Sequence, residues 1–278
     1  MPALMRAQTY VHCLVEKIGC PSADFEGEIT VTSLQTSSGG RVENKLSFDG
    51  KHVDRKMLKN GNMHLHDTRM HIHYITNIVE NRCIVYSDET RSGVEYPLDK
   101  RPEISPENIA TMDEAVTVDG MTVDTTLIYS KKSAKVLNMN CEASKTIYVS
   151  HYNSALATQT SGESKVEIET WRCTEPSFEG MVLKEILDLK YELKTLMRIK
   201  STTYFSAVVS DIKKQIISDE EFQVPSGYQI TKVRTFYTAQ KKLKDIIKET
   251  EKILKKKKQH PSQLEDNDTF ETESEWED

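Results

Sequence analysis

Four histidines in two closely spaced pairs are the residues of this chain whose types and spacing could do chemistry. They are His64 and His66, then His71 and His73. Because alternate residues of a strand share a face, each pair would present two imidazoles to the same side. A hairpin between the pairs could bring three imidazoles to a zinc ion and leave one position open for a hydrolytic water.

The same pattern has simpler explanations, which are a structural metal ion or histidines that face outward from a strand. A zinc site needs a carboxylate behind its histidine ligands, and Asp67 falls where we expect a turn. We therefore favour outward-facing histidines and predict neither a metal ion nor any other cofactor. A zinc hydrolase built on His64, His66, His71 or His73 is kept as the weak alternative.

Other signatures of enzymes are missing from the chain. Ser38-Gly39-Gly40 lacks the glycine spacing of a phosphate-binding loop and its following Lys-Ser or Lys-Thr, and no GxSxG motif occurs. We predict that the protein is not an enzyme and that it has no small-molecule substrate.

Segments for export or membrane insertion are not evident. No stretch approaches the roughly 20 apolar residues of a membrane-spanning helix, and the N-terminus lacks the apolar core of a signal peptide. The five cysteines are scattered and form no CxxC pair, which favours reduced thiols in a cytosol or nucleus. We expect a protein that is not secreted.

The charges are segregated toward the C-terminal end. The chain holds 37 Lys and Arg against 43 Asp and Glu, yet residues 264–278 contain acids and no Lys or Arg. A lysine-dense run precedes this acidic stretch. The pattern favours a polyanion-binding segment with a tail that competes for it, although a solvated helix face with a solubilising tail explains it equally well.

Lysines beside aromatic residues give a further signal for nucleic-acid binding. Phosphate contacts from lysines and base stacking on Tyr148, Tyr152 and Trp171 would suit single-stranded RNA, although aromatic residues on strands usually belong to a core. The candidate lysines are Lys131, Lys132, Lys135, Lys145, Lys241, Lys242, Lys244, Lys248, Lys255, Lys256, Lys257 and Lys258.

Hydrophobic periodicity divides the chain into four parts. It predicts a short N-terminal helix within residues 1–24, a β body over 25–175, a helical region over 176–258 and a disordered acidic tail over 259–278. Expected strands lie near 28–34, 42–48, 70–79, 82–87, 115–118, 121–129, 134–140, 145–151 and 164–172. Many short strands without long intervening helices favour a mainly β fold with an antiparallel, jelly-roll-like β domain.

The C-terminal region carries two apolar seams with helical spacing. The first is formed by Val182, Ile186, Leu189, Leu193 and Leu196, and the second runs from Phe236 to Ile253. Such spacing is typical of coiled coils. We expect helices that pack within the chain or associate between chains, and the first seam is the candidate surface for oligomerisation.

The order of motifs over about residues 50–172 resembles a known family. Met57-Leu58-Lys59-Asn60-Gly61 precedes an apolar stretch at 71–75, and a second apolar stretch ends in Asp88, followed closely by Arg91. Strand-like segments at 126–129, 148–152 and 166–171 come after. This pattern is similar to that of the thirty-kilodalton (30K) superfamily of plant-virus cell-to-cell movement proteins.

The resemblance implies a jelly-roll-like body and a function without catalysis. Asp88 would be the characteristic aspartate of the family, and we expect it to act structurally with Arg91 in holding a turn. The implied partners are single-stranded RNA or a viral nucleocapsid, further copies of the chain, and host plasmodesmal or membrane-associated proteins. The implied location is the host cytoplasm, the cell periphery and plasmodesmata.

We therefore predict a viral movement protein that carries nucleic acid from cell to cell. The alternative is a matrix-like structural scaffold that acts only through protein contacts. Salt-sensitive binding of RNA distinguishes the two.

Overall fold

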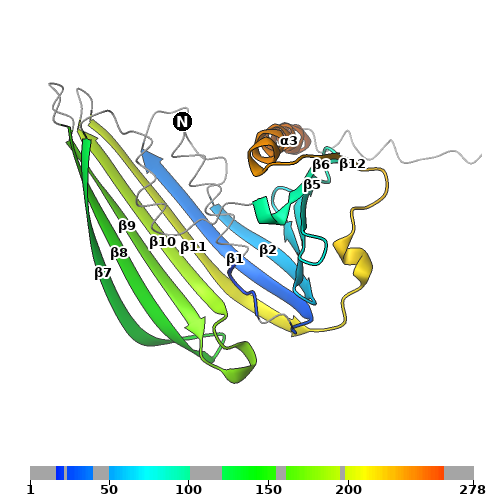
Figure 1. Cartoon of the computed structure of the whole chain (residues 1–278), viewed down its shortest axis with the longest axis horizontal. Coiled ribbons are helices and arrows are strands. Elements are labelled where there is room, and N and C mark those ends of the chain that lie inside the picture. The colour runs from blue at the N-terminus through cyan, green and yellow to red at the C-terminus, as the bar shows by residue number, and fades with distance from the viewer. Residues whose placement is uncertain are drawn as a thin grey trace, which may run out of the picture.

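In a computed structural model of the chain, a single sheet of twelve strands dominates the described residues (Figure 1). The structure describes residues 17–21, 24–39, 50–100, 121–154, 161–194 and 198–259. The strands are β1 (Gly27–Gly39), β2 (Gly50–Lys59), β3 (Asn62–Asp67), β4 (Ile72–Asn77), β5 (Arg82–Ser87), β6 (Ser92–Pro97), β7 (Met121–Val136), β8 (Met139–Ser154), β9 (Ser161–Cys173), β10 (Val182–Lys194), β11 (Arg198–Lys214) and β12 (Gln229–Lys232). The described helices are the short 3-10 helices η2 (Leu98–Lys100), η4 (Pro176–Phe178) and η5 (Asp219–Phe222), and the α-helix α3 (Phe236–Gln259).

The order of strands across the sheet is β12-β6-β5-β4-β3-β2-β1-β11-β10-β9-β8-β7. Neighbours run antiparallel except β12 and β6, which are parallel. The pairing of β1 with β11 brings together segments that are far apart in the chain. This pairing joins the two halves of the sheet.

The long-stranded half consists of β7 to β11 and β1, whose strands have 13 to 17 residues. Figure 1 shows that these strands curl together into a trough. Their side chains alternate between a buried face and a more exposed face. This alternation is typical of an antiparallel sheet that is buried on one side.

The meander consists of β2 to β6, and its last four strands repeat with a step of ten residues. Each has six residues, and four residues join it to the next. The last residue of each connection has a positive φ, at His71 (51°), Asn81 (49°) and Arg91 (46°). The repeated left-handed residue lets each short connection reverse the chain in the same way, which keeps the register constant.

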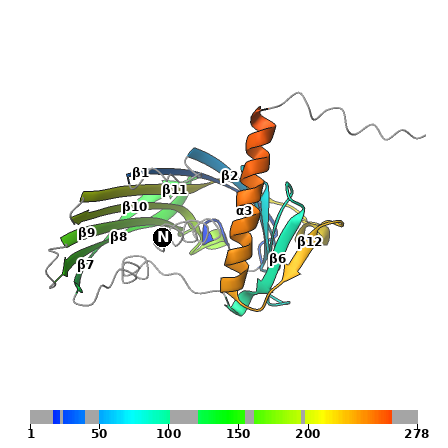
Figure 2. The ribbon, with the colours of Figure 1, turned by 90° about the horizontal axis from the view of Figure 1, so that it is seen from above.

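Both faces of the meander are covered. On one face α3 packs, and the hydroxyl of its Thr250 lies 2.7 Å from that of Ser87. On the other face a segment that contains η5 packs on a small core formed by Ile75, Ile84 and Tyr86 together with Ile217 and Phe222. Figure 2 shows α3 beside β6, and β12 pairs with β6 as the edge strand of the sheet.

The prediction of a jelly-roll-like domain is wrong, because the strands form one open sheet and not two packed sheets. The prediction of a helical, coiled-coil-prone region over 176–258 is also wrong: residues 182–194 and 198–214 are the strands β10 and β11, and α3 is the single α-helix of the described C-terminal residues. In β10, Leu187, Leu189 and Tyr191 alternate with charged residues. Because Ile186 on the other face of this strand and Val182 at its start are apolar as well, apolar residues also occur three and four positions apart. This spacing imitates that of a helical seam.

Several strand predictions correspond to observed strands, namely those near 28–34, 70–79, 82–87 and 164–172. The strand predicted over 134–140 is wrong, because the chain reverses at Leu137 and Asn138, which both have positive φ and join β7 to β8 as a hairpin. Residues 1–16, 22 and 23 of the range predicted for the N-terminal helix lie outside the described residues, and the described residues 17–21 and 24 form no helix beyond Lys17. The strands predicted near 42–48 and 115–118 and the acidic tail from residue 260 also lie outside them.

Candidate functional site

The concave face of the sheet can be identified from strand register. A row of directly paired residues crosses the sheet from Ser87, which contacts α3, through Ile72, Asp67 and Asp54 to Val31. Directly paired residues share a face. Because α3 lies inside the curve of the sheet in Figure 2, this row belongs to the concave face.

The concave face of the long-stranded half is largely apolar. Ile168 pairs with Leu187, which pairs with Phe205, and these three side chains are at most 5% exposed. Other buried side chains on this face of β1, β9, β10 and β11 are Ile29, Val31, Ser33, Gln35, Ser164, Val166, Thr170, Glu185, Thr203, Ala207 and Val209. The main contacts of α3 and η5 are with β3 to β6.

Three ionisable groups are buried on the concave face. Burial raises the pKa of Glu185, whose carboxylate accepts a hydrogen bond from Thr170, to about 7. Burial and the nearby charge of Asp67 raise the pKa of Asp54 to about 7. Lys56 is fully buried and donates to a backbone carbonyl oxygen. An apolar surface with a few polar groups is typical of sites for small molecules.

The convex face of the same strands is charged. Hydrogen bonds from Lys145 and Lys165 lower the pKa of Glu167 to about 2. Other ion pairs on this face join Lys132 to Glu169, Lys190 to Asp188 and Lys200 to Glu192. Partly exposed ion pairs of this kind add little stability. They indicate that water contacts the convex face.

The strand lysines predicted to bind nucleic acid lie at or near the β7–β8 hairpin. Lys131, Lys132 and Lys135 line an open hollow of about 720 Å³ there. Three of the four predicted strand lysines form ion pairs, which are Lys131 with Glu142, Lys132 with Glu169 and Lys145 with Glu167. Of the predicted stacking residues, Trp171 is 8% and Tyr148 is 9% exposed, so each offers little ring surface to a base. The side chain of Tyr152 lies outside the described part.

The lysines of α3 face solvent. The buried side of the helix includes Ala239 and Thr250 and packs on β5 and β6. The exposed lysines are Lys241, Lys242, Lys244, Lys248, Lys252, Lys255, Lys256, Lys257 and Lys258, and the helix carries only the acids Asp245, Glu249 and Glu251. Lys252 is paired with Glu249. Among the described residues, no helix is long and apolar enough to span a membrane.

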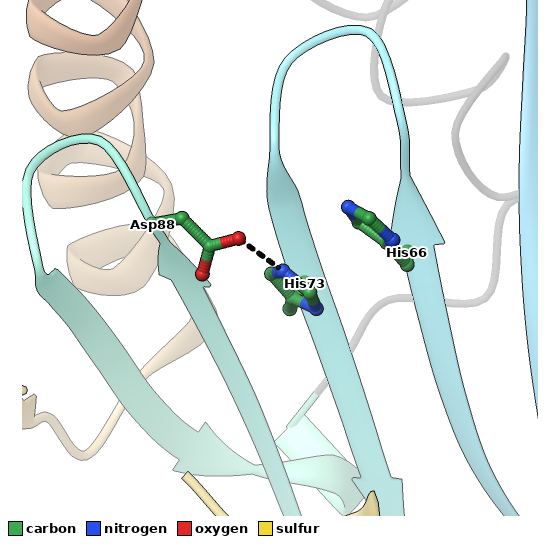
Figure 3. Close-up of side chains that lie close together, drawn as sticks. All are labelled: His66, His73 and Asp88. Carbon is green, nitrogen blue, oxygen red and sulfur yellow. Dashed lines mark hydrogen bonds and ion pairs between the residues drawn. The ribbon is translucent and has the colours of Figure 1, made fainter. Parts of the chain in front are cut away.

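Three of the four predicted histidines gather with Asp88 on the face of the meander opposite α3 (Figure 3). His66 and His73 are paired across β3 and β4, and their rings stack with centroids 4.1 Å apart. Nε2 of His73 lies 2.9 Å from Oδ2 of Asp88. Nδ1 of the same His73 ring lies 2.8 Å from Nε2 of His64. The four side chains therefore form one connected cluster.

Two histidines of this cluster are held neutral. Burial, reinforced by the electrostatic effect of the neighbouring His73 ring, lowers the pKa of both His64 and His66 to about 4. Nε2 of His66 is buried and has no hydrogen-bond partner, whereas the buried Nδ1 of His64 lies 3.8 Å from the carboxylate of Glu221. A buried polar atom without a hydrogen-bond partner lowers the stability of the fold. Such an atom therefore calls for an explanation, and a functional role is one.

Asp88 is also held by a distant part of the chain. The hydroxyl of Tyr228 donates to Oδ1 of Asp88 over 2.9 Å, across a separation of 140 residues. Burial would raise the pKa of Asp88, but the hydrogen bonds from His73 and Tyr228 lower it. Arg91 lies three residues after Asp88, at the left-handed position of the same turn. Sequence reasoning missed Tyr228, because no local pattern links it to Asp88.

His71 points to a different partner from the other three histidines. Its Nδ1 lies 2.8 Å from Glu89, and the same carboxylate lies 2.7 Å from Nζ of Lys257 on α3. The side chain of Glu89 is only 5% exposed. This contact fastens α3 to the turn after β5, so Lys257 is not free to bind a phosphate.

Four of the five residues predicted to form an oligomerisation seam lie on β10, and Leu196 lies outside the described residues. Ile186 pairs with Glu169 on the charged convex face, whereas Leu189 pairs with Val166 on the concave face. These side chains point in opposite directions, so they do not line one surface. Val182 begins the same strand and is buried, and the side chains of Leu193 and Leu196 lie outside the described part.

No known protein family matches this chain, and no curated protein matches it. The inference of function therefore rests on the geometry of the described residues.

Proposed function

We propose that the protein binds an apolar molecule, or the acyl chain of a larger one, on the concave face of its long-stranded half. The observation that carries this proposal is the contrast between the two faces of the same strands. Ile168, Leu187 and Phe205 lie on the concave face, while ion pairs occupy the convex face.

The physical basis is the tendency of a curled sheet to enclose what lies inside its curve. The apolar side chains Ile168, Leu187 and Phe205 are at most 5% exposed, so a bound molecule would have to displace the groups that bury them and take their place, as ligands fill the interior of small β-barrels. Glu185, with its Thr170 hydrogen bond, offers a polar contact within this surface. A bound molecule of this kind would be cargo and not a substrate, in keeping with the prediction that the protein is not an enzyme.

A titration of the full chain with a fluorescent fatty acid tests this function. We expect saturable binding that Leu187→Trp weakens at least tenfold, because the larger ring fills the concave face. The matched control is Ile186→Trp, one residue along β10 on the convex face, which should bind like the unaltered chain. Circular dichroism checks that both variants fold. Equal binding by folded Leu187→Trp and Ile186→Trp would refute the proposal.

A second function, binding of single-stranded RNA, is favoured by the lysine-covered outer side of α3. Lysine contacts to phosphates release counterions, so such binding weakens steeply as salt increases. This surface is the best support for the predicted role as a movement protein, because the strand lysines are largely paired with acids.

The test is a titration of the full chain with random-sequence single-stranded RNA at several salt concentrations. Changing Lys255, Lys256 and Lys258 to Glu should abolish salt-sensitive binding, whereas changing Lys131, Lys132 and Lys145 to Glu should leave most of it. An absence of binding at low salt would favour the alternative, a scaffold that acts only through protein contacts. Transport between cells and the plasmodesmal location stay predictions.

A further inference from the structure

We propose that His66, His73 and Asp88 form a binding site for one zinc ion or a similar transition-metal ion. Their ligand atoms all lie within 4.8 Å of one another. Two imidazoles and one carboxylate form a donor set that zinc binds in proteins, and a three-residue set leaves a coordination position open. This inference goes beyond the binding of an apolar molecule and is independent of it.

The backbone places the three donors securely. His66 and His73 are directly opposite each other on neighbouring strands, and Asp88 follows β5, the next strand of the meander. Figure 3 shows His73 between the other two side chains. Sites built on strands hold their donors more firmly than sites on long loops, so the backbone requires little rearrangement to bind an ion.

An unsatisfied nitrogen points to a missing partner. Nε2 of His66 is buried and has no hydrogen-bond partner, although a buried polar atom normally has one. The rings of His66 and His73 are nearly parallel, with an interplanar angle of 7°. Because a metal ion lies in the plane of each imidazole that binds it, at least one ring must rotate, which separates the stacked pair.

Supporting hydrogen bonds also match those of a metal site. Histidine ligands usually hydrogen-bond through their second nitrogen, and ligand carboxylates through their second oxygen. His73 meets His64 through Nδ1, which leaves Nε2 for an ion. Asp88 accepts the hydroxyl of Tyr228 on Oδ1, which leaves Oδ2. These are the two atoms that now form the His73–Asp88 hydrogen bond, and an ion would replace it.

The test is a titration of the metal-free full chain with zinc chloride by calorimetry, and with cobalt chloride by visible absorption. We expect one ion per chain and the absorption of four-coordinate cobalt. His66→Gln and Asp88→Asn should each weaken zinc binding by about tenfold or more, and Tyr228→Phe, which removes only a supporting bond, by about tenfold. Magnesium, which prefers oxygen ligands, should not compete.

The matched control is His71→Gln, which changes a histidine of the same sequence motif that contacts Glu89 and not the cluster. It should bind zinc like the unaltered chain. Because Asp88 is partly exposed, Asp88→Asn should remain folded, and circular dichroism confirms this for each variant. Failure of the unaltered chain to bind zinc, or equal affinity in Asp88→Asn and His71→Gln, would overturn the proposal.

Discussion

The long-stranded half and the meander belong to one continuous sheet, but they bury their side chains in different ways. The meander has short strands and a described cover on each face, formed by α3 on one side and the η5 segment on the other. The long-stranded half has one charged face and one apolar concave face. Within one sheet, the chain thus combines a part with described layers on both faces and a curled part with one apolar and one charged face.

This difference fits a different binding role for each part of the sheet. In the meander, packing on both faces holds His66, His73 and Asp88 with supporting contacts from distant residues such as Tyr228. In the long-stranded half, the apolar side chains on the inside of the trough are buried. A packed region suits precise placement of a few donors, whereas a curled sheet suits an apolar cargo whose contacts are spread over many residues.

The largest expected effect concerns which face of the long-stranded half is its core. Phe205→Ala removes a side chain that is 1% exposed on the concave face, so the free energy of unfolding should fall by about 3 to 5 kcal/mol. Leu34→Ala, at a convex-face position that is 40% exposed, should cost only about 0.5 kcal/mol. Urea denaturation of both variants measures this, and similar losses would contradict the assignment of faces.

A comparable effect should appear in the pH dependence of stability. The pKa of Glu185 is about 7 in the folded chain and 4.5 as an ordinary side chain. Between these values the folded state keeps a proton that the unfolded state has lost, so stability falls as pH rises, by about 3 kcal/mol for this group.

Glu185→Gln should remove this part of the decline between about pH 4.5 and pH 7, as measured by urea denaturation across that range. Asp54, which has a raised pKa for the same reason, contributes equally to both proteins. The exposed Glu179→Gln serves as the control and should keep the slope of the unaltered chain. An unchanged slope in Glu185→Gln would show that this carboxyl is not buried.

A smaller effect is expected where α3 covers the meander. Thr250→Val leaves the buried hydroxyl of Ser87 without its partner, so unfolding should become easier by about 1 to 3 kcal/mol. Adding Ser87→Ala removes the unsatisfied group and should recover much of that loss. A double-mutant cycle by thermal denaturation measures the coupling, and independent effects would mean that the helix does not dock through this pair.

The smallest effect is a gain in stability at a repeated turn of the meander. Arg91 has a φ of 46°, a conformation that costs a non-glycine residue about 1 to 2 kcal/mol. Arg91→Gly relieves this strain at some cost in chain entropy, so we expect a gain of up to about 1 kcal/mol. Lys51→Gly, in an extended strand, should instead destabilise. A loss in Arg91→Gly would indicate that the arginine side chain matters more than the turn.

Sequence patterns located several elements because their signals are local. The run of β-branched and aromatic residues at 82–87, with its flanking turns, predicted a strand that the fold contains. The apolar spacing from Phe236 to Ile253 predicted the helix α3. The exposure of the α3 lysines could be predicted in the same way, because a helix that packs one side on a sheet leaves its opposite side in water. The histidine motif was also visible in the sequence.

Other features could be decided only by tertiary structure. The apolar residues of 182–194 fit both the period of two of a strand and the three-and-four spacing of a helix. The pairing of this segment with β9 and β11 decided that it forms the strand β10. The pairing of β1 with β11 joins residues about 180 positions apart, and no local pattern specifies such a pairing. The single open sheet was therefore not predictable from the periodicity that suggested a jelly roll.

The histidine motif illustrates the same limit within the site. The sequence determined that His64, His66, His71 and His73 lie close together along the chain. The tertiary structure decided that His71 turns to Glu89 while the others gather around Asp88, with Tyr228 behind it. Residue spacing defines which face of a strand a side chain occupies, but only the packing of distant segments determines which groups that face meets.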